Sequence, residues 1–421
     1  MKKNYLQNLD DAHLRLIRDV SRAADQQKIS VYIVGGIVRD ILLRKKTFDL
    51  DISVEGDAIP LAKMLGRKWK SDVIVHKKFG TAIVHHKKGG HVDFASTRKE
   101  CYSRPGILPV VSRGSLSEDL KRRDFTINAM AIAINHNSFG RLIDDVGGLK
   151  DLAERKIRIL HAQSFVDDPT RILRAVRFEQ RFHFCIERKT FLQMREVIKS
   201  GGFETVTGTR LFNEFKKILN ESDPLSCLRR LRRVEGLKFL PFKIVGNFRT
   251  LSDIHARIQK AKRKTVYKEF DSWWLIYFIG LIEVAPSCVR KGALAKLGLC
   301  REEITSILEC QSYEDIIKSL SAKECFASQV YQLLSPLTLT CIVYLRVRTS
   351  REVVFRRIDK FLSKDCYVNL QINGDDLKRI GVASGVEIGR ILRKLLYLKV
   401  DKKVRIRREE LNTARAFKNS F

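Results

Sequence analysis

The sequence predicts an α+β fold, in which an N-terminal head at 1–145 combines a mixed sheet with helices and the rest of the chain is helical. Short runs with strand periodicity recur between residues 31 and 95, whereas from about residue 146 the apolar residues recur at helical spacing. With 421 residues, 44% of them hydrophobic, the chain can bury roughly two to four separate cores. We place a helical neck at 146–220, a helical body at 221–345 and a helical tail at 346–421.

The head begins with a helical stretch at 11–29, which leads into a short apolar strand, Val31-Tyr32-Ile33-Val34. This strand stops at Gly35-Gly36, and a helical stretch follows at 38–43. Further strands are expected at 48–54, 72–76, 82–86 and 91–95. In the neck and early body, amphipathic helices are expected at 148–154, 169–182, 188–200, 208–220 and 225–235.

The chain is strongly basic, with 80 Lys and Arg against 48 Asp and Glu, a formal net charge of +32. An excess of this size, spread over several domains, favours a long polyanion such as nucleic acid as partner. The longest apolar run, 273–282, is about half as long as a membrane span. The nine cysteines are scattered without a C-x-x-C pair, and residues 1–11 have no apolar core. We therefore expect a soluble cytoplasmic protein with no membrane contact and no obligate protein partner.

Carboxylates supply the first candidate chemistry. In a strand, Asp49 and Asp51 point to the same face while Leu50 points to the other. Two such carboxylates can hold divalent cations. The Gly35-Gly36 turn before them lets backbone N–H groups approach phosphate oxygens. Asp93, in another expected strand, completes the three acids that two-metal phosphoryl or nucleotidyl transfer requires, although a lone strand Asp is more often structural.

Three segments in order resemble one family. Gly35-Gly36-Ile37-Val38-Arg39-Asp40 followed by Asp49-Leu50-Asp51 is similar to the first signature of the class II tRNA nucleotidyltransferase and bacterial poly(A) polymerase family, within the DNA polymerase beta superfamily. Residues 122–129, beginning Arg122-Arg123-Asp124, resemble its second signature, and residues 167–178, beginning Asp167-Asp168-Pro169, its nucleotide-selecting helix. Residues 372–377 and 385–389 resemble its tail.

The resemblance implies a polymerase-beta-like head, two Mg²⁺ ions held by Asp49 and Asp51, and Asp93 as a further catalytic acid. The substrates would be ATP, CTP and the acceptor and T arms of tRNA, with the body and tail binding the RNA. Asp124 would accept a hydrogen bond from a ribose hydroxyl, although it can equally be a helix cap. The expected nucleotide-binding residues are Gly35, Gly36, Arg39, Arg123, Asp124, Asn128, Asp168, Arg171, Arg174 and Arg177.

Asp168 and Arg171 lie three residues apart at an expected helix start, so one helix end can present both side chains. A carboxylate that accepts and a guanidinium that donates match the amino group and ring nitrogen shared by adenine and cytosine. Uracil and guanine present the opposite polarity. The pair would therefore admit ATP and CTP without a nucleic-acid template, and the resemblance assigns this role to the same two residues.

The family includes enzymes that add different nucleotides to RNA, and the sequence leaves several of these activities open. The stretch 97–118 is full length, which argues against addition of CC alone, and 75–82 is more similar to the tRNA enzymes than to poly(A) polymerases. The sequence therefore predicts full CCA addition, with A-only addition, CC addition and poly(A) synthesis as alternatives. A further alternative is an RNA-binding protein whose transferase head has lost its activity. Such a protein would be expected to lack a metal ligand or the selecting pair, but Asp49, Asp51, Asp93, Asp168 and Arg171 are all present, which argues against it.

Overall fold

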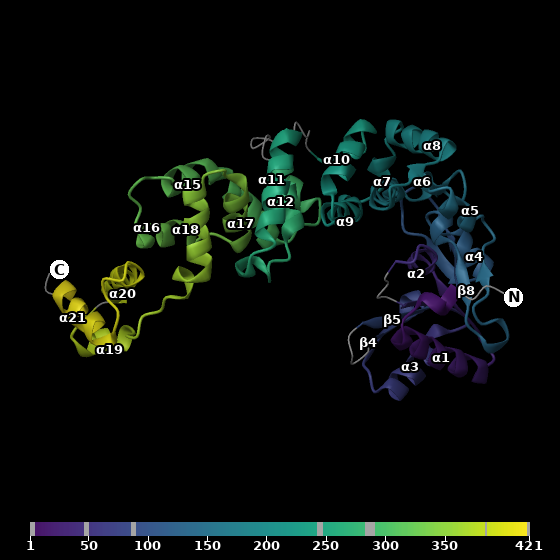
Figure 1. Cartoon of the computed structure of the whole chain (residues 1–421), viewed down its shortest axis with the longest axis horizontal. Coiled ribbons are helices and arrows are strands. Elements are labelled where there is room, and N and C mark those ends of the chain that lie inside the picture. The colour runs from purple at the N-terminus through teal and green to yellow at the C-terminus, as the bar shows by residue number, and fades with distance from the viewer. Residues whose placement is uncertain are drawn as a thin grey trace. The chain divides into compact units, whose positions relative to one another are not determined.

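The computed structural model describes residues 5–45, 50–85, 90–241, 247–282, 291–383 and 385–418. It divides into two compact units, Met1–Phe239 and Leu240–Phe421, which are coloured from purple to teal and from teal to yellow in Figure 1. The first unit holds the sheet and the second is helical, so the predicted fold class is confirmed.

Seven strands of the first unit form one sheet in the order β3-β4-β5-β2-β1-β8-β9. Only β2 and β5 are parallel to each other, and the other pairs are antiparallel. The strands are β1 (Ser30–Val34), β2 (Leu50–Glu55), β3 (Val73–His76), β4 (Thr81–His85), β5 (His91–Ser96), β8 (Ala131–Ala133) and β9 (Leu142–Ile143). The strand predictions are confirmed for the described residues, but β8 and β9, with three and two residues, are too short to leave a periodic pattern.

The two faces of the sheet differ in chemistry because side chains alternate along each strand. Ile33, Ile52 and Phe94 belong to one buried face, and α1 (Asp11–Gln26) and α3 (Ala58–Trp69) pack against these strands. Asp51 and Asp93 belong to the opposite face. Because Ile52 and Phe94 point into this core, the neighbouring Asp51 and Asp93 point to the other side of the sheet.

The remaining head elements include the hairpin β6 (Arg98–Cys101) and β7 (Val110–Arg113), which the sequence analysis did not predict. In α4, Leu116 and Leu120 pack against Val34 and Ala131 of the sheet. The other elements up to residue 153 are η1 (Tyr5–Asn8), α2 (Gly36–Leu42), η2 (Lys77–Phe79), α4 (Leu116–Lys121), η3 (Thr126–Asn128), η4 (His136–Ser138) and α5 (Gly148–Ala153).

The helices predicted after residue 146 are present, and α7 packs against α9 and α10. They are α6 (Ser164–Asp167), α7 (Thr170–Phe182), α8 (Arg188–Lys199), η5 (Gly202–Thr205), α9 (Gly208–Leu219) and α10 (Pro224–Arg233). The neck also contains a parallel pair of two-residue strands, β10 (Lys156–Ile157) and β11 (Cys185–Ile186). His183, at φ 55°, ends α7 and turns the chain back into β11, which is too short to be predicted from its sequence.

In the second unit, α11, α12 and α17 pack together, and α19 packs with α20 and α20 with α21. One core joins Leu320, Leu334, Leu345 and Ile358, and another joins Leu377 and Leu395 with their neighbours. The elements are α11 (Phe248–Ala261), η6 (Thr265–Tyr267), α12 (Trp273–Ile282), α13 (Lys291–Ala295), α14 (Arg301–Glu309), η8 (Cys310–Ser312), α15 (Tyr313–Leu320), α16 (Ala327–Leu334), α17 (Leu339–Arg348), α18 (Glu352–Ser363), η9 (Asp365–Tyr367), α19 (Gly374–Arg379), α20 (Gly385–Val400) and α21 (Arg407–Lys418).

Within the described ranges, no single helix combines the length and the apolar character that a membrane span needs. The helices α16 and α17 reach that length and composition only when they are counted together, and they are bent by 117°.

Candidate active site

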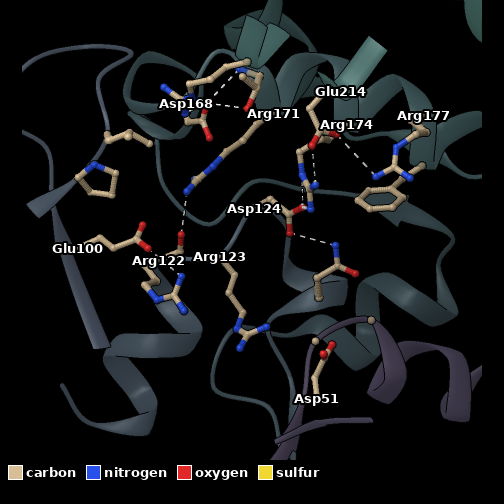
Figure 2. A pocket seen from close by; sticks show the side chains of 18 of the residues that line it. Asp51, Glu100, Arg122, Arg123, Asp124, Asp168, Arg171, Arg174, Arg177 and Glu214 are labelled. Atoms are coloured by element: carbon tan, nitrogen blue, oxygen red, sulfur yellow. Dashed lines mark hydrogen bonds and ion pairs between the residues drawn. The ribbon is translucent and has the colours of Figure 1, made fainter. Parts of the chain in front are cut away.

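A cavity of about 670 Å³ opens in the first unit, lined from the β1–α2 turn, β2, the β6–β7 hairpin, α7 and α9 (Figure 2). It brings together the predicted site residues Gly35, Gly36, Arg39, Asp51, Arg123, Asp124, Asn128, Asp168, Arg171, Arg174 and Arg177. Within the described part of the chain, nine arginines and five carboxylates line it. The excess of positive charge suits a polyanionic ligand such as a triphosphate.

Gly35 lines the cavity beside Asp51. Its backbone has φ +80° and ψ −138°, a conformation that glycine adopts without strain. A Cβ at this position would lie 2.8 Å from Nη1 of Arg123 and 3.8 Å from Oδ2 of Asp51. Glycine is therefore required here both by the backbone and by the close approach of these two side chains.

Asp51 and Asp93 are neighbours across the parallel pair β2–β5, where they stand in direct register. Both are partly exposed, and Nε2 of His91 lies 3.7 Å from Oδ2 of Asp93. Asp51 lines the cavity. Asp49, the other predicted metal ligand, lies outside the described residues. The predicted pairing of Asp49 with Asp51 therefore stays a prediction, and the neighbour that the structure describes beside Asp51 is Asp93.

The donor chemistry of this face fits Mg²⁺, because carboxylate oxygens are the hard ligands that this ion prefers. Among the described residues, no group of three or more His, Cys, Asp and Glu side chains is arranged to hold a metal ion. The expected metal ligands are Asp49 and Asp51, and of these two the structure describes Asp51.

The Arg122-Arg123-Asp124 segment follows α4 and is fixed by a buried acid. Asp119, 1% exposed, accepts hydrogen bonds from Arg122 Nη2 at 2.7 Å and Arg123 Nη2 at 2.9 Å. Burial opposes ionisation of Asp119, but the charges of Arg123 and Arg122 outweigh it and hold its pKa below the ordinary value. Both arginines therefore keep fixed orientations at the edge of the cavity.

Asp124 lies inside a chain of buried hydrogen bonds, shown by dashed lines in Figure 2. Its Oδ2 accepts from Arg174 Nη2 at 2.5 Å and Nε at 2.9 Å, and its Oδ1 accepts from Asn128 Nδ2 at 3.0 Å. Burial would raise the pKa of Asp124, but Arg174 and the hydrogen bond from Asn128 lower it below the ordinary value. The carboxylate that was expected to meet a ribose hydroxyl is thus already engaged by the protein.

Two further arginines join this chain at its ends. Arg39 Nη1 donates to Oδ1 of Asn128 at 2.6 Å. On the other side, Glu214 of α9 lies 3.4 Å from Nη1 of Arg174 and 3.8 Å from Nη2 of Arg177. The guanidinium of Arg39 also lies over the ring of Phe182, 4.4 Å from its centroid. The cations of the cavity are therefore held in place before any ligand binds.

The predicted selecting pair lies on the other side of the cavity from Asp51 in Figure 2. Oδ1 of Asp168 accepts from the backbone N–H of Thr170 at 3.1 Å, so the predicted capping contact exists, although the N-cap itself is Pro169. Arg171 donates from Nη1 to Ser164 Oγ at 2.5 Å and from Nη2 to the carbonyl oxygen of Arg122 at 2.8 Å. Since a guanidinium has five N–H groups, these two bonds leave donors for a base.

The sequence analysis missed the residues that support these groups. Glu100 accepts from Arg122 at 2.9 Å, Arg98 at 3.0 Å and Tyr102 at 3.0 Å, and burial together with Glu100 raises the pKa of Tyr102 to about 12. The alternation Arg98-x-Glu100-x-Tyr102 could have revealed a strand face. The contact of Arg210 with Asp168 was not expected from the sequence either.

Comparisons with known proteins agree with this geometry. Residues 31–158 match the family model described as the poly A polymerase head domain, and residues 183–242 match the one described as the probable RNA and SrmB-binding site of polymerase A. The chain is 34% identical over 408 residues to the A-adding tRNA nucleotidyltransferase of Geobacter sulfurreducens, with 95% of this chain and 46% of that protein covered. The chain thus spans about half the length of that relative.

Two further matches cover most of both chains. The A-adding tRNA nucleotidyltransferase of Halalkalibacterium halodurans is 31% identical over 383 residues, which are 89% of this chain and 85% of that protein. The solved structure of the Thermotoga maritima CCA-adding enzyme complexed with tRNA is 33% identical, with a TM-score of 0.70 and coverage of 98% and 97%. Since the match extends from the head through the helical regions, the chain belongs to the tRNA nucleotidyltransferase family.

Proposed function

We propose that this protein adds nucleotides to the 3′ end of tRNA without a nucleic-acid template, using CTP and ATP to build CCA. One observation carries the proposal: a single cavity holds Asp51, the pair Asp168 and Arg171, and an excess of arginines. One bound nucleotide could therefore contact Asp51 with its phosphates and the pair Asp168 and Arg171 with its base. The family membership supports nucleotide transfer to tRNA, and the solved relative from Thermotoga maritima is a CCA-adding enzyme.

Two Mg²⁺ ions held by Asp49 and Asp51, with Asp93 beside them, would activate the RNA 3′-hydroxyl and neutralise charge on the triphosphate. The protein's own cations bind and orient the triphosphate. Arg39, Arg123 and Arg174 line the cavity with their guanidinium groups already fixed by hydrogen bonds. Fixed charges need little reorganisation during the reaction, which is the main source of such catalysis.

In the reaction, the 3′-oxygen of the RNA attacks the α-phosphorus of the nucleotide, and a new phosphodiester bond forms. The bond from the α-phosphorus to the bridging oxygen breaks, and pyrophosphate leaves with the electron pair. Asp93 would accept the proton of the 3′-hydroxyl, a role supported by its position in register with Asp51 on the neighbouring strand. No covalent enzyme intermediate is required.

Asp168 and Arg171 choose the base. A carboxylate oxygen of Asp168 accepts from the exocyclic amino group of adenine or cytosine, and an unused N–H of Arg171 donates to the ring nitrogen beside it. A carbonyl group at the same position, as in uracil or guanine, would face the carboxylate with two acceptors opposed. This polarity is the basis for excluding UTP and GTP.

The helical regions are proposed to hold the RNA. The net charge of +32 suits the phosphate backbone, and residues 183–242 match a model described as a probable RNA-binding site. The acceptor and T arms would lie on the body, 221–345, and the tail, 346–421. Arg230 of α10 is bound to Glu179 at 2.6 Å, so this arginine supports the fold.

Addition of the terminal A alone is a second candidate. It is favoured by the names of the two relatives above, both A-adding enzymes, one of which is matched over 85% of its length. The same cavity suits this activity, because adenine and cytosine offer the same amino group and ring acceptor to Asp168 and Arg171. The two candidates therefore differ in substrate and not in chemistry.

An extension assay separates the candidates. Purified protein and Mg²⁺ are incubated with tRNA ending at the discriminator base, at C or at CC, and with labelled ATP or CTP, separately and together. Growth of every substrate to CCA supports full addition, whereas extension of only the CC-ended tRNA, by one A, supports A addition. Long A-tails on any RNA would contradict both. The Asp51→Ala protein is the matched control for contaminating activity.

A further inference from the structure

Arg210, the third residue of α9, bridges two segments of the cavity that are distant in sequence. Its Nη2 donates to Oδ1 of Asp168 at 3.1 Å, and its Nη1 donates to the carbonyl oxygen of Gly106 at 2.5 Å. Gly106 belongs to the connection between β6 and β7, and Asp168 to the connection between α6 and α7. One guanidinium therefore ties the hairpin to the residue that is proposed to read the base.

The turn at Gly106 is seated tightly. Its N–H donates to the carbonyl oxygen of Asp167 at 3.1 Å, and its φ is +73°. A Cβ at Gly106 would lie 2.2 Å from Oγ1 of Thr205 and 2.5 Å from its carbonyl oxygen. Only glycine fits between Arg210 and Thr205, so the backbone carbonyl that Arg210 binds has a fixed position.

The bridge also fixes the orientation of the Asp168 carboxylate. Oδ1 accepts three hydrogen bonds, from the N–H of Thr170 at 3.1 Å, from its hydroxyl at 2.6 Å and from Arg210. In the ranges that the structure describes, Oδ2 accepts no hydrogen bond. With Oδ1 fully used, Oδ2 is the oxygen left to accept from an amino group in the cavity.

We infer that Arg210 is a positioning residue for nucleotide selection: it holds Asp168 so that Oδ2 meets the exocyclic amino group of adenine or cytosine, and it makes this orientation depend on the turn at Gly106. The inference rests on the proposed function. Without the bridge only the two hydrogen bonds from Thr170 hold the Asp168 carboxylate, so its orientation is less fixed. Both the repulsion of a carbonyl group in uracil or guanine and the attraction of an amino group then weaken.

The first test compares all four ribonucleotides on CC-ended tRNA. Arg210→Met removes both hydrogen bonds and keeps the length of the side chain, and Arg18→Met, on the exposed side of α1 in the head, is the matched control. We expect the ratio of kcat/KM for ATP to that for GTP to fall about tenfold in Arg210→Met, with KM for tRNA unchanged. An equal loss for all four nucleotides, as a purely structural role predicts, would overturn the inference.

A double-mutant cycle then asks whether Arg210 acts through Asp168. If it does, Arg210→Met changes kcat/KM for ATP less than about twofold in an Asp168→Ala background. Additive losses would place the action of Arg210 elsewhere and overturn the inference.

Gly106→Ala provides a second variant in case Arg210→Met does not fold. It keeps Arg210 but displaces the turn, because the added Cβ overlaps Thr205. We expect the ratio of kcat/KM for ATP to that for GTP to fall in this variant as well, by about threefold or more. An unchanged ratio in a folded Gly106→Ala protein would overturn the dependence on the turn. Failure of the unmodified protein to extend any tRNA would contradict the proposed function itself, whereas a selective protein with an equally selective Arg210→Met variant contradicts only this inference.

Discussion

Replacing Arg174 with Met is expected to destabilise the first unit by about 3 kcal/mol at pH 7. Asp124 is 8% exposed and receives two of its hydrogen bonds from Arg174, at 2.5 and 2.9 Å. Removing one partner of a buried ion pair costs about 3–5 kcal/mol, because the other charge stays buried and uncompensated. Asn128 and the backbone N–H of Phe125 still bind Asp124, which places the cost at the lower end of this range.

The effect depends on pH in a direction that the structure determines. Burial raises the pKa of Asp124, but Arg174 lowers it below the ordinary value. The ion pair therefore stabilises the native protein fully above the pKa of the unfolded carboxyl group, about 4. This stabilisation is lost as the pH falls through the lower pKa of the native carboxyl group. In Arg174→Met only the burial remains, and Asp124 takes up a proton at higher pH. The difference in stability between the two proteins should therefore shrink on acidification from pH 7.

Hydrogen–deuterium exchange of peptides from α7 is the appropriate assay, because a melt of the whole chain would mix the two compact units. The matched control is Arg181→Met on the same helix, where the side chain is 46% exposed and lies 3.8 Å from Glu221. Such an exposed pair is worth about 0–1 kcal/mol. A loss below about 1 kcal/mol in Arg174→Met at pH 7, or the same loss at pH 4 as at pH 7, would refute the reasoning.

Four further predictions concern the cavity. Gly35→Ala should lower kcat/KM at least about tenfold, because alanine is strained at this φ and its Cβ, 2.8 Å from Nη1 of Arg123, would displace Arg123 and the turn beside Asp51. Unchanged extension of CC-ended tRNA would contradict this prediction. Asp51→Ala should slow nucleotide transfer about a thousandfold while tRNA affinity in a filter-binding assay stays within about twofold; retained turnover would remove Asp51 from the reaction centre. Arg171→Ala should raise the kcat/KM for GTP and UTP relative to that for ATP by a larger factor than it weakens ATP binding. An unchanged ratio would contradict the proposal that Arg171 donates to the ring nitrogen of the base. Tyr102, whose pKa is raised to about 12 by burial and by Glu100 against about 10 when unfolded, contributes stability that is complete below pH 10 and lost as pH rises toward 12. Tyr102→Phe should reduce this alkaline loss, as measured by labelling of the buried Cys227 thiol of the first unit in urea at pH 9 and 11, and an equal alkaline loss in both proteins would contradict it.

The predictions that succeeded rest on local periodicity. Strands were expected at 48–54 and 91–95, and β2 (Leu50–Glu55) and β5 (His91–Ser96) lie there. The helix expected at 169–182 begins at Thr170 and ends at Phe182, as the apolar spacing indicated. These features depend on residues within a few positions of each other, so the sequence contains the necessary information.

The residues that were missed depend on contacts between distant segments. Glu100 and Arg122 are 22 residues apart, and Asp168 and Arg210 are 42 apart. Nothing in the spacing of such residues distinguishes a charge that pairs from one that faces solvent. The hairpin β6–β7 was also missed, since its strands have only four residues each and carry few apolar side chains.

The sequence by itself determined the fold class, the order of the motifs and the supply of carboxylates and arginines, because these follow from periodicity, composition and resemblance. Only the tertiary structure decided which charges are already paired: Asp124 with Arg174, and Asp168 with Arg210. The physical reason is that burial makes an unpaired charge costly, so the packing of α7 against Phe125 of the head and against α9 selects partners that no local pattern specifies.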